Sequence, residues 1–191
     1  MTASRLFRIL GTLAIAIGAG CFSYVATVLL QARQHRASYV NAVPASRSAA
    51  PAPLSIGAAI GEIRIERLGV NAVITEGDTD AILDLGPGHL PDTPWLGEPG
   101  NVVIAGHRDT TFRPLKDARA GDIITVSSGI VTRRYRVSST RIVMPSDVSV
   151  LEPGTENSLT LITCYPFYFV GHAPKRFIVR AEEMPSVTAG R

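Results

Sequence analysis

Short apolar runs separated by turn-forming residues cover the chain from Ile60 onward. Some of these runs alternate apolar with polar residues, and Gly, Pro, Asp or Asn stands between most of them, as is typical of successive strands in a sandwich or barrel. One short helix is predicted around Thr79–Leu85, with Asp78 or Thr79 as its N-cap. The predicted strand runs are residues 60–70, 71–77, 101–107, 122–129, 130–143, 159–164 and 176–181.

The first apolar stretch of the chain is of a different kind. Residues 9–30 form 22 positions without a formal charge, and arginines stand on both sides of them. A helix of this length spans roughly 33 Å, enough to cross a bilayer. The apolar part of a cleaved signal peptide is shorter, about 7–15 residues, so we predict an uncleaved, single-pass transmembrane signal-anchor in the cell membrane. Because the β-rich part follows this anchor, we expect it on the extracytoplasmic side.

Composition divides the remaining chain into four further parts. We expect a basic flank at residues 1–8, a flexible linker rich in Ala, Pro and Ser at 31–55, the β domain at 56–183 and a tail at 184–191. Residues 1–55 hold five arginines and no acid, whereas residues 56–191 hold 14 Lys and Arg against 16 Asp and Glu. A nucleic-acid-binding protein needs its basic excess on the folded domain, so we expect no nucleic-acid partner.

The candidate chemistry centres on one thiol. Cys21 lies inside the predicted anchor, so Cys164 is the only cysteine of the β domain and has no disulfide partner there. It ends the predicted strand 159–164, where a rigid strand delivers the sulfur to a loop. A free thiol is mostly protonated at neutral pH, so a nucleophilic cysteine needs a base or cation nearby. A lone cysteine is also often a small buried apolar side chain, and the residues alone leave both interpretations open.

Two further residues accompany this thiol. His107 ends the predicted strand 101–107, as Cys164 ends its own. Arg176 opens the last predicted strand, twelve residues after Cys164, and a hairpin return would bring it alongside the sulfur. A guanidinium in that place stabilises the oxyanion of acyl transfer, or it is a surface arginine.

The other ionisable residues show less of a pattern. We expect solvated or turn positions for His35, His89 and His172, and a surface position for Arg180. The sequence contains no Cys-x-x-Cys pair and no close group of histidines, so we predict no metal site and no cofactor.

Two stretches carry a resemblance to a known family. Residues 105–110 read Ala-Gly-His-Arg-Asp-Thr, and residues 159–167 read Leu-Thr-Leu-Ile-Thr-Cys-Tyr-Pro-Phe. Together with Arg176 and the anchor, they resemble the sortases, most closely those of class D, over residues 56–183. The resemblance implies an all-β fold: an eight-stranded β-barrel with one or two short helices, preceded by an N-terminal transmembrane helix. It also implies a cysteine transpeptidase with Cys164 as nucleophile, His107 as general acid and base, and Arg176 stabilising the oxyanion and positioning the peptide.

The same resemblance implies the substrates. They are LPxTG-like sorting signals of exported proteins, cleaved between Thr and Gly through a thioester, and an amine acceptor of the cell envelope or a pilin. The peptide is expected in an apolar groove, and alternation does not decide which of Val102, Ile104, Leu161 and Ile162 line it. Two alternatives stay open: a cysteine hydrolase that uses water, and a non-catalytic anchored barrel in which Cys164 is buried.

Overall fold

The computed structural model describes residues 10–27, 30, 55–154, 156–168 and 171–185. The predicted flank 1–8, the linker apart from residue 55, most of the tail, and His35 therefore lie outside the described residues. The N-terminal helix Leu10–Thr27 is long and apolar enough to cross a membrane, as expected for residues 9–30. This helix and the β domain are separate compact units.

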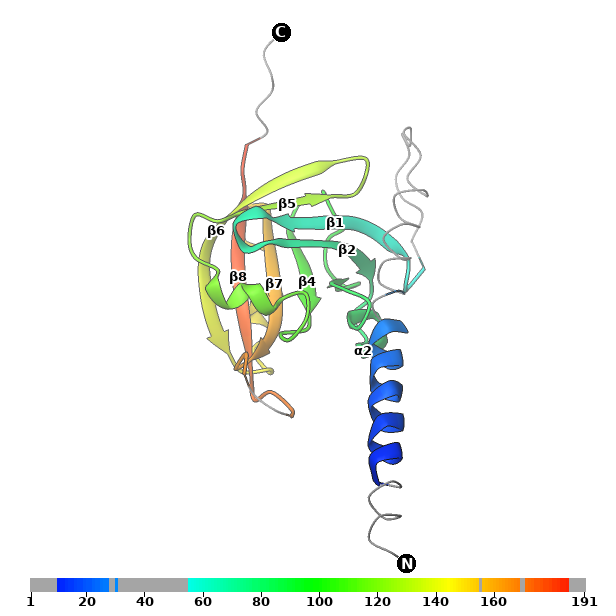
Figure 1. The fold of residues 1–191 in the computed structure, drawn as a ribbon. Coiled ribbons are helices and arrows are strands. Elements are labelled where there is room, and N and C mark those ends of the chain that lie inside the picture. Colours follow the sequence, from blue (N-terminus) through cyan, green and yellow to red (C-terminus); the bar gives the residue numbers. More distant parts are fainter. Residues whose placement is uncertain (1–9, 28–29, 31–54, 155, 169–170, 186–191) are drawn as a thin grey trace, which may run out of the picture. The chain divides into compact units, whose positions relative to one another are not determined.

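Eight strands close a mixed barrel in the order β1-β2-β3-β4-β7-β8-β6-β5 (Figure 1). This confirms the expected eight-stranded, all-β architecture. The strands are β1 (Ala59–Ile65), β2 (Val70–Glu76), β3 (Gly88–His89), β4 (Asn101–Gly106), β5 (Ile123–Ser127), β6 (Thr132–Val143), β7 (Ser158–Tyr165) and β8 (Lys175–Glu183). The short helical elements are η1 (Glu66–Leu68), α2 (Asp80–Leu83), η2 (Arg113–Asp117) and η3 (Val148–Leu151).

The direction of the strands determines which ends meet. Strands β4 and β7 run parallel, whereas β7 and β8 run antiparallel. Figure 1 shows β6, β8, β7 and β4 side by side in this order. The carboxyl ends of β4 and β7 therefore lie at the same end of the barrel as the beginning of β8.

Alternate residues of these three strands point into the barrel. The inward residues are fully or almost fully buried and belong to one apolar core. Burial of a Val, Leu or Ile side chain stabilises the fold by roughly 1.5–3 kcal/mol relative to leaving it exposed. In β4, β7 and β8 they are Val102, Ile104, Leu159, Leu161, Val179 and Ala181. The residues between them face the opposite side of the sheet, because successive side chains of a strand alternate.

The region after β2 differs from the prediction in two ways. The helix predicted at 79–85 is the shorter α2, and its N-cap Thr79 makes no side-chain capping hydrogen bond. The two-residue strand β3, which pairs in parallel with β2 and antiparallel with β4, was not predicted.

The expected solvated or turn position of His89, a residue of β3, was wrong. Its side chain is fully buried, with Nδ1 2.8 Å from the Glu76 carboxylate and Nε2 3.0 Å from the Pro94 carbonyl oxygen. Both ring nitrogens have partners, so burying this imidazole leaves no polar atom unsatisfied.

Candidate active site

Three adjacent strands bring the predicted site residues to one end of the barrel. Cys164 of β7 pairs directly with Arg176 of β8. On the other side of β7, Thr163 pairs with Gly106, the last residue of β4, and its hydroxyl donates to the Gly106 carbonyl at 2.7 Å. His107 therefore leaves β4 beside Cys164. All three side chains line one cleft with a volume of about 410 Å³.

The floor of this cleft is apolar. One rung below the His107, Cys164 and Arg176 positions, the outward residues are Ala105, Ile162 and Ile178, which pair across the same three strands and line the cleft. The structure thus separates the four residues that alternation had left undecided. Ile162 lines the cleft, whereas the other three belong to the core, and these are Val102, Ile104 and Leu161.

Two segments form the walls of the cleft. The connection between β6 and β7 contributes mainly apolar side chains from Met144 to Leu151, including Val148 and Val150 of η3. The opposite wall comes from the region around α2, with Asp78, Asp80 and Leu83. A cleft with an apolar interior and a few charged groups at one end is the usual form of a ligand site.

Aromatic packing holds the end of β7 that carries the thiol. Tyr165 follows Cys164, and its ring packs against those of Phe167 and Phe177, with ring centroids 6.1 and 6.4 Å apart. Phe167 and Phe177 also pack edge to face at 5.2 Å. Each such pair contributes about 0.5–1.5 kcal/mol beyond the area it buries. Cys164 itself is partly exposed, so a thiol on a fixed strand is open to the cleft.

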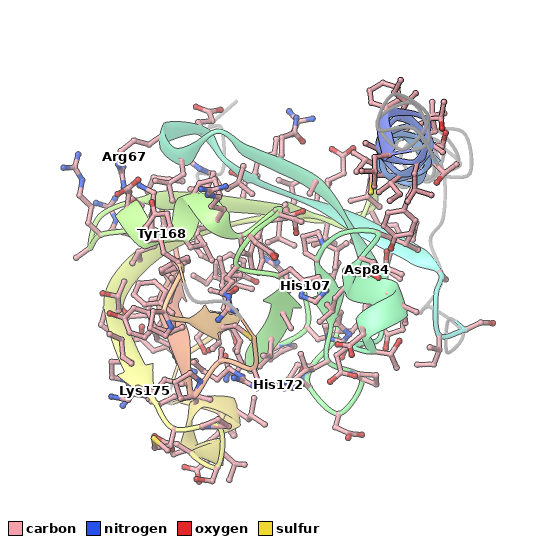
Figure 2. All side chains as sticks on the ribbon, turned by 60° about the horizontal axis from the view of Figure 1, so that its bottom comes forward. Arg67, Asp84, His107, Tyr168, His172 and Lys175 are labelled. Atoms are coloured by element: carbon pink, nitrogen blue, oxygen red, sulfur yellow. The ribbon has the colours of Figure 1, made fainter. Side chains whose placement is uncertain are left out.

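The imidazole of His107 has a carboxylate partner that the sequence analysis missed. Its Nε2 lies 3.2 Å from Oδ1 of Asp84, the C-cap of α2, and Figure 2 shows the two side chains next to each other. The side chains are 28% and 62% exposed, so the pair is solvated and contributes little to stability. Its chemical effect is to hold one ring nitrogen in a defined direction. Nothing in the 23-residue separation signals this pair, since it depends on how α2 folds against β4.

Gly106 fixes the position of His107 from the inner side of the sheet. The ring of Phe112 packs so closely that a Cβ at residue 106 would lie 2.6 Å from its Cδ2 atom. Phe112 is fully buried, and its backbone N–H donates to the His107 carbonyl at 3.1 Å. Only glycine permits this approach, so the turn after β4 and the imidazole it carries are held by packing against the core.

The guanidinium of Arg176 is held by its own turn. Its Nη1 donates to the carbonyl oxygens of Ala173 at 3.3 Å and Lys175 at 3.1 Å. Both of these hydrogen bonds come from one of the three guanidinium nitrogens, and the group has five N–H donors in all. The side chain lines the same cleft as Cys164, its partner in the β7–β8 register, and brings a positive charge to that cleft.

The remaining predicted positions lie elsewhere. His172 is exposed in the turn between β7 and β8 (Figure 2), as expected. The surface position expected for Arg180 is wrong, because its side chain is half-buried and its Nη1 donates to the Thr160 hydroxyl. Burial is the main cause that lowers the pKa of Arg180, and the positive charge of Arg141 is the second. Within the described ranges, no group of three or more His, Cys, Asp or Glu side chains is placed to hold a metal ion.

Comparison with known proteins assigns the family. The model of the sortase domain matches residues 63–184. Sortase D of Bacillus subtilis is 36% identical over 124 residues, which are 64% of this chain and 63% of that protein, and sortase A of Staphylococcus aureus is 41% identical over 71 residues, or 34% of each chain. The chain thus matches less than two thirds of the length of these curated relatives.

Solved structures agree with this assignment. A sortase D5 transpeptidase of Clostridium perfringens superposes with a TM-score of 0.63 at 32% identity, covering 69% of this chain and 82% of that one. Sortase E of Streptomyces avermitilis, as a T196V mutant, gives a TM-score of 0.59 at 30% identity, covering 69% and 91%. From the eight-stranded barrel, the matched domain and these neighbours, the chain belongs to the sortase family.

Proposed function

We propose that the protein is a membrane-anchored cysteine transpeptidase that cleaves LPxTG-like sorting signals between Thr and Gly. One observation carries the proposal: His107, Cys164 and Arg176 stand at the meeting ends of three adjacent strands and line one cleft. A nucleophile, a proton carrier and a cation are the three groups that acyl transfer through a thioester requires.

In the first half-reaction the Cys164 thiolate attacks the carbonyl carbon of the Thr residue. A tetrahedral oxyanion forms, and the Arg176 guanidinium stabilises its negative charge. As the oxyanion collapses, the C–N bond to Gly breaks and the His107 imidazolium gives its proton to the departing amine. The product is a thioester between Cys164 and the Thr carbonyl, and His107 is left neutral.

In the second half-reaction an amine acceptor of the cell envelope or a pilin attacks the thioester carbonyl. His107 takes the proton that this amine loses, and the C–S bond breaks to release the Cys164 thiolate and a new amide. Water in place of the amine gives hydrolysis as a side reaction. Asp84 holds Nε2 of the His107 ring by accepting a hydrogen bond, which limits the ring orientations in both steps.

The surroundings of the cleft fit this substrate class. Ala105, Ile162 and Ile178 give an apolar floor for the Leu and Pro side chains of a sorting signal, beside the charged groups that act on its Thr–Gly bond. We assign residues 9–30 as the membrane anchor and 31–55 as the tether of a catalytic domain at 56–183. On this assignment the cleft acts outside the cytoplasmic membrane, where the sorting signals of exported proteins arrive.

The test uses the full chain with a fluorogenic LPxTG-type peptide, with and without triglycine. We expect release of the Gly-containing fragment, a covalent adduct on Cys164 in the mass spectrum, and a ligated product only with triglycine. Cys164→Ala abolishes both adduct and product. Cys21→Ala is the matched control, because it removes the cysteine of the N-terminal helix and leaves the cleft intact.

Three results would contradict the proposal. Turnover by Cys164→Ala would exclude the thioester. Equal hydrolysis and no ligated product at any triglycine concentration would identify a hydrolase. A Cys164 that resists both the peptide and small thiol reagents would identify a structural cysteine.

A further inference from the structure

A fully buried asparagine links the sheet to the connection between β6 and β7. Asn101 is the first residue of β4 and faces the same side of the sheet as the cleft floor, four residues before Ala105. Its Nδ2 donates to the carbonyl oxygens of Val150 at 3.1 Å and Glu152 at 3.3 Å. These carbonyls lie in η3 and directly after it.

The chemistry of the side chain determines which way its amide points. Two carbonyl oxygens accept hydrogen bonds and cannot donate, so the NH₂ group must face η3. The Oδ1 atom then faces β7, where it accepts from the hydroxyl of Thr160 at 2.8 Å and, more weakly, from that of Ser158 at 3.4 Å. Both donors and both acceptor sites of the amide are therefore used in a buried place, where an unpaired polar atom is costly.

A third strand extends this linkage. Arg180 of β8 donates from Nη1 to the Thr160 hydroxyl at 3.0 Å, so that hydroxyl accepts from Arg180 and gives its own proton to Asn101. The other end of the guanidinium reaches the same connection, because a Cβ at Gly154 would lie 2.9 Å from Nη2 of Arg180. We call Asn101, Thr160 and Arg180 the amide latch.

The amide latch holds a wall of the cleft and not the reacting groups. Val148, Val150 and Leu151 of η3 line the cleft, and the carbonyl of Val150 is one of the two that Asn101 binds. Along the same face of the sheet, the apolar rung of Ala105, Ile162 and Ile178 separates the latch from Cys164 and its neighbours. A change at Asn101 therefore acts on the wall before it acts on the chemistry.

We propose that Asn101 is a positioning residue for substrate binding: its amide fixes η3 in the arrangement that receives the peptide before the peptide arrives. A wall that is ordered in advance costs no ordering entropy on binding. The inference rests on the proposed function, since the peptide is the substrate of that cleft. On this proposal Asn101, which is remote from the thiol, affects KM and leaves kcat unchanged.

The test compares Asn101→Asp with Ser158→Ala in the full chain. Asp keeps the size and the acceptor but removes both N–H donors and turns a charge toward two carbonyls. Ser158→Ala removes only the 3.4 Å bond to Oδ1 and touches neither carbonyl of η3. For Asn101→Asp we expect KM for the sorting peptide to rise about tenfold with kcat within twofold, and amide exchange in residues 148–152 to accelerate at least about tenfold. Ser158→Ala should match the wild type in all three.

Alkylation of Cys164 by iodoacetamide separates this role from damage to the site. The reagent is small and needs no wall, so its rate should be the same in Asn101→Asp and wild type. An unchanged exchange rate at 148–152, or an unchanged KM with faster exchange, would overturn the inference. Wild-type protein that processes no sorting peptide would instead refute the proposed function, whatever the exchange rates are.

A second variant covers the case in which Asn101→Asp does not fold. Thr160→Val keeps the shape of the side chain but removes the hydroxyl that orients the amide and binds Arg180. We expect a smaller effect in the same direction, about threefold in KM and a measurable gain in exchange at 148–152. A fall in kcat with no change in KM would contradict the role of the latch.

Discussion

Gly106→Ala is the substitution that most directly tests how the core positions the imidazole. The added Cβ would lie 2.6 Å from Cδ2 of Phe112 and 2.9 Å from Cε2 and Cγ, whereas ordinary contact begins at 3.4 Å. The difference between 3.4 and 2.6 Å is 0.8 Å, and the ring or the strand must move by that amount. Phe112 is fully buried, and overpacking of such a site costs about 1–3 kcal/mol. We expect the free energy of unfolding to fall by this amount in urea titrations.

The effect on activity should exceed the effect on stability. His107 is the next residue, so a displaced strand end displaces its ring, and a misplacement of about 1 Å can cost roughly 100-fold in rate. We expect kcat for a sorting peptide to fall about 10- to 100-fold, with KM changed less than about threefold, since the apolar floor is not touched.

A double-mutant cycle with Phe112→Ala identifies the cause. Alanine lacks the Cγ, Cδ2 and Cε2 atoms that the new methyl group would meet, so Gly106→Ala should be better tolerated in the Phe112→Ala background by about 1 kcal/mol or more. If the stability changes of the two substitutions are additive, the reasoning is refuted. The clash with the Phe112 ring would then not be the cause of the destabilisation by Gly106→Ala.

Three further predictions concern charged and titratable groups. Asp84→Ala should lower kcat about two- to fivefold through a less ordered His107 ring, and Asp84→Asn, which keeps an acceptor, should lose less; equal losses in steady-state assays would contradict this. The Arg67 guanidinium, through its hydrogen bonds, lowers the pKa of Asp122, so the carboxylate stabilises the fold above its ordinary pKa of 3.8 and this contribution disappears as the pH falls through the lowered value. Asp122→Asn should therefore have a lower urea midpoint than wild type at pH 7, with the gap closing in acid; a gap that is constant with pH would count against the ion pair. Burial raises the pKa of Tyr135 to about 12 from 10.0, so wild type should lose stability relative to Tyr135→Phe as the pH rises from 10 to 12, and parallel curves in urea titrations would show that the phenol is not buried in solution.

Much of the barrel follows from local patterns. In β1 and around Tyr135 and Val137 of β6, apolar residues at alternate positions indicate a strand with one buried face. In β4 and β7 the predicted runs are short and rich in β-branched residues, and both faces are largely buried. The two-residue β3 has no periodicity to detect, and the Gly-Pro-Gly preceding His89 is typical of a turn. The burial of the His89 imidazole depends on its hydrogen bond with Glu76, 13 residues away, and no local signal in the sequence indicates that pair.

The candidate site was predictable only in part. A cysteine and a histidine that each end a strand are visible in the sequence, but the pairing of β4 with β7 that places them side by side is long-range and was not predicted. The family resemblance alone assigned both residues to one site. Asp84 and Asn101 were missed because their roles arise from contacts with α2 and η3. The surface position predicted for Arg180 is wrong, because the half-burial of its side chain against the β6–β7 connection depends on tertiary packing.

The parallel pairing of β4 with β7 also determines when during folding the site comes into existence. The two strands are joined in the latch by residues 59 positions apart, and the β5–β6 hairpin lies between them in the chain. Chains dominated by such distant pairings fold slowly, because the entropy of closing the loop is lost before any contact compensates it. The thiol and the imidazole therefore become neighbours only when this long-range pairing forms, and no local segment of the chain carries both groups.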